Sequence, residues 1–330
     1  MSDGMVVGLD VGGTSTRATV VSLSGERLGT GRAGGGNPTS HGAEQAAAQL
    51  RAALTDALAG LDPALVRAGV IGLAGAGRLL ADPAGRAAFD RTWQEVGLRC
   101  EYDIVGDALV AYASGTAEPD GTILIAGTGA IAAEVRDMAL DRVADGHGWL
   151  LGDAGSGFWL GREAVRHALA DLDRHQPPGP LSTLVLTELL GSAEVAARPR
   201  DTVDVLVQTV TRRPAVELAA LAPLVLRAGI DGDPAATAIF GEAARLLSAN
   251  VDRIRPAVAR TPIVLGGGLF FVDTPLAQTV RSALAARWPE APLRYADDGA
   301  LGAAWLAARS LPELTDPADL HRRLFDPVDG

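Results

Sequence analysis

Three aspartates of this chain lie beside glycine-rich turns, where a carboxylate can act on a bound phosphate group. Asp10 precedes the turn Gly12-Gly13-Thr14, Asp107 follows a glycine, and Asp153 lies in a third glycine-rich stretch. A carboxylate can accept the proton of an attacking hydroxyl group or bind hydrated Mg²⁺. Glycines let backbone N–H groups approach an anion closely, because no Cβ intervenes. These three aspartates are therefore the first candidates for a phosphate-handling site.

The turn Gly12-Gly13-Thr14 has a counterpart in Gly127-Thr128-Gly129. Each turn follows a short apolar segment, Val6–Asp10 in the first case and Thr122–Ala126 in the second. This repetition is weak, but it favours two related half-domains. Two such turns facing each other could hold the phosphate chain of ATP. Taken singly, either turn could equally be a plain hairpin connection.

The chain contains no lysine, so all 29 of its Lys and Arg residues are arginines. This absence excludes a Walker A lysine, the strand lysine of protein kinases and any Schiff-base lysine. Arginine cannot replace a Schiff-base lysine, because its guanidinium stays protonated. If phosphates bind here, backbone N–H groups, hydroxyl groups and Mg²⁺ must do most of the binding.

The second turn also fits a different motif. Gly127-x-Gly129-x-x-Ala132 after an apolar strand matches the dinucleotide fingerprint, which would indicate an NAD-dependent oxidoreductase. That interpretation needs a helix from Ala130 and an acidic residue at the end of the next strand. Asp145 lies at a suitable distance, but residues 142–144 are too short to predict a strand. The interpretation also leaves the Asp10 turn unexplained.

Two further glycine clusters are candidates for ligand contacts. Asn37 follows Gly34–Gly36, and an amide in such a loop can both donate to and accept from sugar hydroxyl groups. An ordinary Asn-Pro turn is the interpretation that the local sequence favours. Gly266-Gly267-Gly268 follows the apolar segment 263–265 and could let adenine or ribose pack closely. It could equally be a turn that leads into a helix.

The composition limits the classes of protein that the chain can belong to. With 330 residues and 48% hydrophobic residues, two domains with full cores are expected. No apolar run reaches the roughly 18 residues that span a bilayer. The single cysteine, Cys100, excludes an internal disulfide and a cysteine-based zinc or iron–sulfur site within the chain. The five histidines show no metal-binding spacing, and only His147 lies in a glycine-rich loop.

The charge balance argues against two kinds of partner. The formal net charge is −11, which makes binding to nucleic acid or to an anionic membrane surface unfavourable. The first residues lack the basic and apolar regions of a signal peptide. We therefore expect a cytoplasmic protein.

Alternating strand and helix patterns predict an α/β fold. The polar turn 115–121 is the predicted domain boundary. Residues 131–136 are ambiguous between strand and helix. The tail 312–330 is expected to be polar and at the surface. Predicted strands are 6–10, 17–23, 27–32, 66–73, 101–105, 122–126, 263–265 and 293–295; predicted helices are 42–58, 85–96, 107–114, 158–174, 216–228, 235–254, 275–287 and 299–308.

Taken together and in this order, the motifs resemble one family. The sequence is similar to the N-acetylglucosamine kinases of the BadF/BadG/BcrA/BcrD group, within the actin/hexokinase/Hsp70 superfamily. The resemblance covers nearly the whole chain. The motifs that carry it are Asp10-x-Gly-Gly-Thr, Gly106-Asp107-Ala108, Gly127-Thr128-Gly129, Gly148-Trp-Leu-Leu-Gly-Asp-x-Gly-Ser156 and Gly266-Gly267-Gly268.

The resemblance implies two actin-like (ribonuclease H-like) lobes, each with a mixed five-stranded sheet flanked by helices, and an active-site cleft between them. The N-terminal lobe would comprise residues 1–115 together with a C-terminal helical segment of about 298–330. The C-terminal lobe would comprise residues 116–297. The implied activity is the transfer of phosphate from ATP, with Mg²⁺, to the 6-hydroxyl group of an amino sugar, and the implied assembly is a homodimer.

The resemblance also assigns roles to individual residues. Asp107 would be the base that deprotonates the sugar 6-hydroxyl group, and Asp10 would order Mg²⁺ through water. Asn37, Asp107, Thr128, Gly146 and Asp153 would bind the sugar. Contacts to the nucleotide would come from Gly12, Gly13, Thr14, Thr128, Gly129, Gly266, Gly267 and Gly268.

Four positions depart from the pattern of the family. Gly106 replaces a common asparagine, Ala130 a serine, Ala154 a glutamate, and His147 a common tryptophan. These departures leave the kinase chemistry plausible but leave the sugar open between N-acetylglucosamine, N-acetylmuramic acid and glucosamine. A non-catalytic, sugar-responsive ATP-binding protein is a further alternative.

Overall fold

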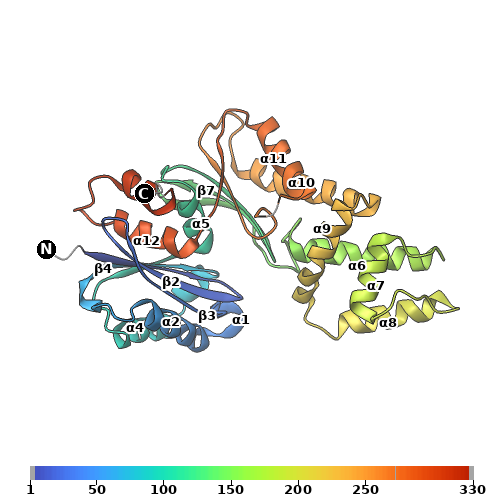
Figure 1. Ribbon diagram of the computed structural model, residues 1–330, viewed down its shortest axis with the longest axis horizontal. Coiled ribbons are helices and arrows are strands. Elements are labelled where there is room, and N and C mark those ends of the chain that lie inside the picture. The colour runs from blue at the N-terminus through green and yellow to red at the C-terminus, as the bar shows by residue number, and fades with distance from the viewer. Residues whose placement is uncertain (1–3, 272, 327–330) are drawn as a thin grey trace. The chain divides into compact units, whose positions relative to one another are not determined.

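The computed structural model describes residues 4–271 and 273–326. The chain folds into two compact units. One contains the residues up to Ile123, Val135–Leu140 and the residues from Arg294 onward, and the other contains Leu124–Glu134 and Asp141–Leu293. The described residues form two five-stranded sheets with helices packed on them (Figure 1), which confirms the predicted fold class.

The first sheet has the strand order β3-β2-β1-β4-β5. β1 pairs antiparallel with β2 and parallel with β4, so the sheet is mixed. The strands are β1 (Met5–Val11), β2 (Ser15–Ser22), β3 (Arg27–Gly34), β4 (Val66–Leu73) and β5 (Tyr102–Gly106). The helices of this unit are α1 (Pro38–His41), α2 (Ala43–Ala57), η1 (Pro63–Leu65), α3 (Ala76–Leu80), α4 (Pro83–Glu95), α5 (Asp107–Gly115), α12 (Gly299–Arg309) and α13 (Pro317–Phe325).

Glycines on the strands of this sheet allow helices to pack against its backbone. A Cβ on Gly8 of β1 would lie 2.0 Å from the backbone nitrogen of Ala304 on α12. A Cβ on Gly31 of β3 would lie 2.0 Å from the carbonyl oxygen of Ala53 on α2. Figure 1 shows α2 and α4 on one face of the sheet and α5 and α12 on the other. Any side chain at Gly8 would therefore force α12 away from the centre of the sheet.

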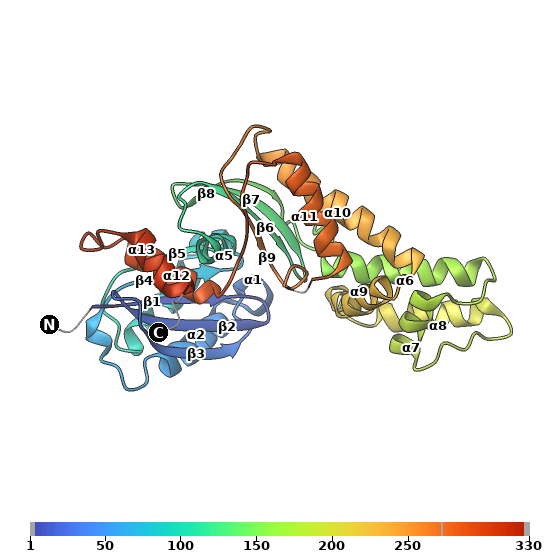
Figure 2. The same ribbon diagram turned by 45° about the horizontal axis from the view of Figure 1, so that its top comes forward.

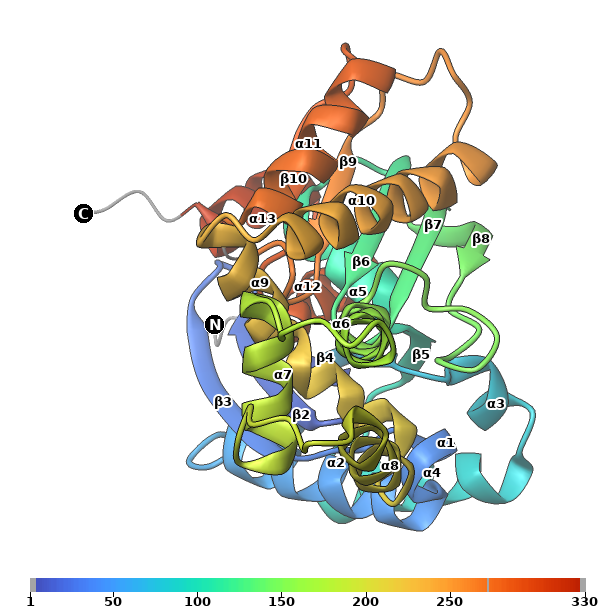
Figure 3. The same cartoon turned by 90° about the vertical axis from the view of Figure 1, so that its right-hand side faces the viewer.

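The second sheet has the order β10-β9-β6-β7-β8 (Figure 3). Read from β8, the second sheet has the order β8-β7-β6-β9-β10. Numbered within its own half of the chain, this is the same order as in the first sheet, which agrees with the expectation of two related half-domains. The strands are β6 (Gly121–Ala126), β7 (Ala130–Arg136), β8 (Ala139–Asp145), β9 (Ile263–Gly266) and β10 (Leu293–Tyr295). The helices are α6 (Gly157–Asp173), α7 (Pro180–Leu190), α8 (Pro199–Thr211), η2 (Ala215–Leu221), α9 (Ala222–Ile230), α10 (Pro234–Ile254) and α11 (Pro275–Arg287). The long helices α10 and α11 lie side by side (Figure 2).

Two of the sequence predictions about secondary structure are wrong. Residues 142–144 belong to the seven-residue strand β8, although the segment was expected to be too short for a strand. The tail is not wholly polar surface, since α13 buries Leu320, His321 and Leu324. Residues 327–330 of the predicted tail lie outside the described residues. The ambiguous segment 131–136 is a strand, β7.

Among the described residues, every helix is too short or too polar to span a lipid bilayer.

Candidate active site

Asp10 is held in place by an arginine on the neighbouring strand. Asp10 on β1 lies directly opposite Arg17 on β2, and Arg17 Nη2 donates to Asp10 Oδ2 at 2.5 Å. Burial raises the pKa of Asp10, and the Asp298 carboxylate raises it further, while Arg17 opposes both effects. A Cβ on Gly299 would lie 2.8 Å from Asp10 Oδ2, so the start of α12 packs against the carboxylate. Asp10 therefore has a fixed orientation at the carboxyl end of β1.

Asp107 lies where strand β5 passes directly into helix α5. Its Oδ1 accepts a hydrogen bond from the backbone N–H of Ala108 at 3.0 Å. Burial raises the pKa of Asp107, and the negative charge of Asp10 raises it further. The first unit thus brings together two of the three predicted aspartates closely enough for the charge of one to act on the other. A raised pKa suits a carboxylate that must accept a proton.

The turn between β1 and β2 is exposed at Gly13 and Thr14, and Gly13 has open space around it. Gly12 N–H donates to Ser15 O at 2.9 Å, and Gly36 N–H donates to Gly12 O at 3.0 Å. A Cβ on Gly13 would have no atom within 4 Å, and the backbone of Gly13 is not in the left-handed region. Nothing in the packing of the described residues therefore requires glycine at position 13. Close approach of a ligand to the backbone would require it.

Asn37 caps a helix, where its local sequence favours an ordinary Asn-Pro turn. Its Oδ1 accepts a hydrogen bond from Thr39 N–H at 2.8 Å, which caps the short helix α1. The residue is only partly buried, and a Cβ on Gly75 would lie 3.3 Å from Asn37 Oδ1. A role for Asn37 in sugar binding stays a prediction.

The turn Gly127-Thr128-Gly129 supports the start of helix α6. Gly127 O accepts the N–H of Gly157 at 2.7 Å, and Thr128 O accepts the N–H of Phe158 at 3.1 Å. The residue after the turn, Ala130, begins strand β7. The dinucleotide interpretation is therefore wrong, because its fingerprint requires a helix at this position to bind the pyrophosphate.

The segment Gly266–Gly268 lies beside this turn in the second unit. Gly267 has a φ of +91°, and a Cβ there would lie 2.4 Å from Ala126 O. A Cβ on Gly127 would lie 3.9 Å from the backbone nitrogen of Gly268. Gly268 and Thr128 are exposed. Two glycine segments that are far apart in the sequence, and that were both predicted to contact the nucleotide, are therefore neighbours.

Asp153 packs against the same turn from the loop between β8 and α6. Its Oδ1 accepts the N–H of Ala130 at 3.1 Å, and a Cβ on Gly129 would lie 2.8 Å from that oxygen. Burial raises the pKa of Asp153, and the charge of Asp145 raises it further. Gly146, at the other end of the loop, is exposed and has a φ of +73°.

Sequence reasoning missed Arg17 and Asp145 as parts of the site. Arg17 could have been found from the hairpin, because a turn centred on Gly13-Thr14 places Asp10 opposite Arg17. The Nε of Arg17 is buried and has no hydrogen-bond partner among the described residues, so it remains able to donate to a ligand or a water molecule. Asp145 was considered only as a nucleotide-binding acid, and nothing local indicated its bonds to residues 153 and 154.

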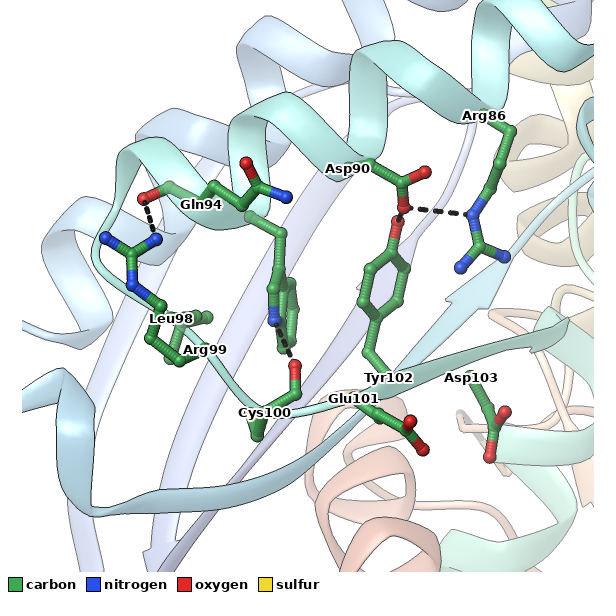
Figure 4. Close-up of a pocket in the computed structure, with 10 residues that line it drawn as sticks. Arg86, Asp90, Gln94, Leu98, Arg99, Cys100, Glu101, Tyr102 and Asp103 are labelled. Atoms are coloured by element: carbon green, nitrogen blue, oxygen red, sulfur yellow. Dashed lines mark hydrogen bonds and ion pairs between the residues drawn. The ribbon is translucent and has the colours of Figure 1, made fainter.

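A separate hollow of about 540 Å³ lies between α4 and β5 and contains none of the predicted site residues. Figure 4 shows its side chains: Tyr102 donates to Asp90 at 2.7 Å, and Arg86 donates to the same oxygen at 3.1 Å. The ring of Tyr102 also stacks on Trp93, with centroids 4.5 Å apart. Arg86, Asp90 and Tyr102 of this hollow thus bond to one another, and the three candidate aspartates lie elsewhere.

Comparisons with known proteins identify the family. The model of the BadF/BadG/BcrA/BcrD ATPase family matches residues 7–307. The chain belongs to this family. Its fold is accordingly of the actin-like type found in sugar kinases.

Three relatives of this BadF/BadG/BcrA/BcrD-family chain align over nearly its full length. An N-acetylmuramic acid/N-acetylglucosamine kinase of Clostridium acetobutylicum is 26% identical, over 92% of this chain and 97% of the relative. An N-acetyl-D-glucosamine kinase of Dictyostelium discoideum is 26% identical, over 94% and 99%. The crystal structure of a candidate N-acetylglucosamine kinase of Chromobacterium violaceum superposes with a TM-score of 0.70 at 26% identity, covering 93% of this chain and 99% of that one.

Proposed function

We propose that this chain is an ATP-dependent kinase that phosphorylates the 6-hydroxyl group of an amino sugar, with N-acetylglucosamine as the first candidate. The family is one of ATPases, and the curated relatives that align over the chain are named as kinases of N-acetylated amino sugars. The observation that carries the proposal is Asp107, a partly buried carboxylate at the junction of β5 and α5, whose pKa is raised by burial and by the charge of Asp10 in the same unit.

Asp107 is the proposed general base. It accepts the proton of the sugar 6-hydroxyl group while the hydroxyl oxygen attacks the γ-phosphorus of ATP and the bond to the bridging oxygen breaks, releasing ADP. Asn37, Thr128, Gly146 and Asp153 bind the sugar hydroxyl groups. Residues of the glycine turns bind the nucleotide: Gly12, Gly13, Thr14, Thr128 and Gly129 the phosphates, and Gly266–Gly268 the adenosine.

Asp10 is the carboxylate proposed to order a magnesium ion through water, while Arg17 donates to its Oδ2 at 2.5 Å. Among residues 4–271 and 273–326, no group of three or more His, Cys, Asp or Glu side chains is placed to hold a metal. Mg²⁺ keeps several water ligands and is bound through one or two carboxylates together with substrate phosphates, which is what a single carboxylate such as Asp10 offers. When bound, Mg²⁺ would supply charge neutralisation at the β- and γ-phosphates.

Replacing Asp107 tests the assignment of the base. Asp107→Asn keeps the shape of the side chain and an oxygen for the Ala108 N–H, but it cannot take the proton. We expect sugar binding within a few-fold of wild type and turnover lower by ~10²–10⁴-fold, the usual contribution of a general base. Isothermal titration with the sugar and a coupled ADP-release assay measure the two quantities. Turnover near the wild-type level would remove Asp107 from this role.

The identity of the sugar is tested by the same assay with four acceptors: N-acetylglucosamine, N-acetylmuramic acid, glucosamine and glucose. The proposal requires release of ADP that depends on at least one amino sugar and that exceeds the rate with glucose. Thermal stabilisation by ATP and sugar without turnover would instead indicate a non-catalytic, sugar-responsive ATP-binding protein. Stabilisation by NADH and not by ATP would contradict the proposal altogether.

We also propose a cytoplasmic location and a homodimeric assembly, both of which rest on the sequence and on the resemblance to the family. Light scattering coupled to size-exclusion chromatography measures the mass in solution, for which a dimer of this 33.8 kDa chain is expected.

A further inference from the structure

The loop between β8 and α6 carries two residues that the proposed function assigns to the sugar, Gly146 and Asp153. Asp145, the last residue of β8, anchors this loop. Asp145 Oδ1 accepts the backbone N–H of Asp153 at 2.6 Å, and Oδ2 accepts the backbone N–H of Ala154 at 3.0 Å. Oδ2 also accepts a hydrogen bond from Asn250 Nδ2 at 3.1 Å. Both oxygens of one side chain are thus engaged by N–H donors.

These bonds explain how a carboxylate can be buried here. Asp145 is only 8% exposed, and a buried charge is tolerated when hydrogen bonds replace its water shell. The donor from outside the loop, Asn250 on α10, is itself fixed, because its Oδ1 accepts a hydrogen bond from Arg253 at 2.8 Å. The loop is therefore attached through Asp145 to the buried side of the long helix α10 in the second unit.

The anchor determines where Asp153 points. Asp153 has a φ of +57°, in the left-handed region that side-chain-bearing residues rarely adopt, so its backbone conformation needs support. The two hydrogen bonds from the N–H groups of Asp153 and Ala154 supply that support. With the backbone fixed, the carboxylate of Asp153 lies against Gly129 and accepts the N–H of Ala130.

Asp145 acts on the loop through these backbone bonds. Its two oxygens accept the N–H groups of Asp153 and Ala154 and the side-chain amide of Asn250. We propose that Asp145 is a positioning residue for the sugar, acting through the backbone of residues 153 and 154 and not by touching the substrate. The hydrogen bonds carry the claim that Asp145 orders the loop. The claim that this ordering affects sugar binding rests on the proposed function.

Kinetics of two Asp145 variants test the consequence. Asp145→Ala removes both acceptor oxygens, so we expect the KM for the amino sugar to rise by about tenfold or more, as for loss of hydrogen bonds to a charged group. The KM for ATP should stay within about twofold. Asp145→Asn keeps one acceptor oxygen and should lie between Asp145→Ala and wild type. Asp173→Ala, which removes an exposed aspartate at the end of α6, is the matched control and should leave both constants unchanged.

The two KM values separate positioning of the loop from a general loss of structure. Equal rises of both KM values in Asp145→Ala, or an unchanged KM for the sugar, would overturn the proposal.

Amide hydrogen exchange tests the anchor without any activity. In wild type, the amides of Asp153 and Ala154 should exchange slowly, and Asp145→Ala should lose this protection while the amides of β9 keep theirs. Unchanged protection would overturn the proposed anchor. If the wild-type protein phosphorylates and binds no amino sugar, the proposed function fails, and the exchange experiment still decides whether Asp145 orders the loop.

Discussion

The two glycine–threonine turns look alike in the sequence but differ in what surrounds them. In the first unit, a Cβ on Gly13 would meet no atom within 4 Å. In the second unit, a Cβ on Gly129 would lie 2.8 Å from Asp153, and the carbonyl groups of Gly127 and Thr128 bind the start of α6. The first turn leaves its backbone open on one side, whereas the second is part of the packing of its unit.

This difference distinguishes two reasons why glycine can occupy a position in a turn. A glycine that the fold requires has a neighbour that a Cβ would strike or a left-handed backbone. A glycine that the fold does not require, in an exposed turn that follows Asp10, is the kind that close approach of a ligand would require. The comparison thus predicts that substitutions in the second unit act on stability, whereas those in the first turn act on nucleotide binding.

The largest expected loss of stability is for Gly267→Ala. The new Cβ would lie 2.4 Å from the backbone oxygen of Ala126, and the φ of +91° would be strained for alanine. We expect the free energy of unfolding to fall by about 2–4 kcal/mol, from overpacking together with the left-handed conformation. Urea denaturation followed by circular dichroism measures it. A variant as stable as wild type would show that the segment can shift away from Ala126.

Gly129→Ala should have the next largest effect. Its Cβ would displace the carboxylate of Asp153 and break the hydrogen bond from Ala130 N–H. We expect a loss of about 1–3 kcal/mol in the free energy of unfolding. We also expect weaker sugar binding by isothermal titration. Equal stability of Gly129→Ala and Gly13→Ala would contradict the inference that the fold requires glycine in the second turn and not in the first.

The pH dependence of stability tests a buried histidine of the first unit, His321. Burial lowers the pKa of His321, whose Nε2 lies 2.9 Å from Ala113 O. As the pH falls through about 6.5, the unfolded chain binds the proton before the folded one does, so stability decreases. His321→Gln should reduce this slope, by at most about 1.4 kcal/mol per pH unit. Urea denaturation between pH 5 and pH 8 measures this slope. An identical slope in wild type and in His321→Gln would show that His321 does not cause the pH dependence.

The smallest effect on stability is expected for Gly13→Ala, within about 0.5 kcal/mol of wild type, as for an exposed position where a new Cβ would meet no atom within 4 Å. Its effect should appear instead as a higher KM for ATP. A rise of about tenfold corresponds to the loss of one charge-assisted hydrogen bond. The KM for the sugar should not change. Measuring both constants in the ADP-release assay checks the assignment, and an unchanged KM for ATP would argue that this turn does not contact phosphate.

Much of the secondary structure could be predicted from local signals. The bounds of β4, α11 and β10 agree with the predicted ranges, because their apolar patterns begin and end at clear turn or capping residues such as Thr274 and Pro275. β8 was missed because it exposes most of its residues and shows little apolar alternation. The helix α13 was missed because only Leu320 and Leu324 mark its buried face within a charged tail.

The site was predictable only in part. The candidate aspartates could be chosen from neighbouring glycines, which is a local property. Contacts between distant segments could not be derived in that way. No pattern near Gly127 indicates that Gly268 is its neighbour, and none near Asp145 indicates Asn250 on a helix more than a hundred residues later. Such pairs depend on the packing of whole elements and not on sequence spacing.

The close packing of β1 against α12 has a consequence for how the protein is made. Gly8 and Ala304 lie backbone to backbone, although they are separated by roughly 300 residues of chain. On a ribosome that adds about 5–20 residues per second, α12 is synthesised roughly 15–60 s after β1. During that interval the part of the nascent first sheet that α12 covers is exposed, so the first unit can be completed only after the second unit has been synthesised.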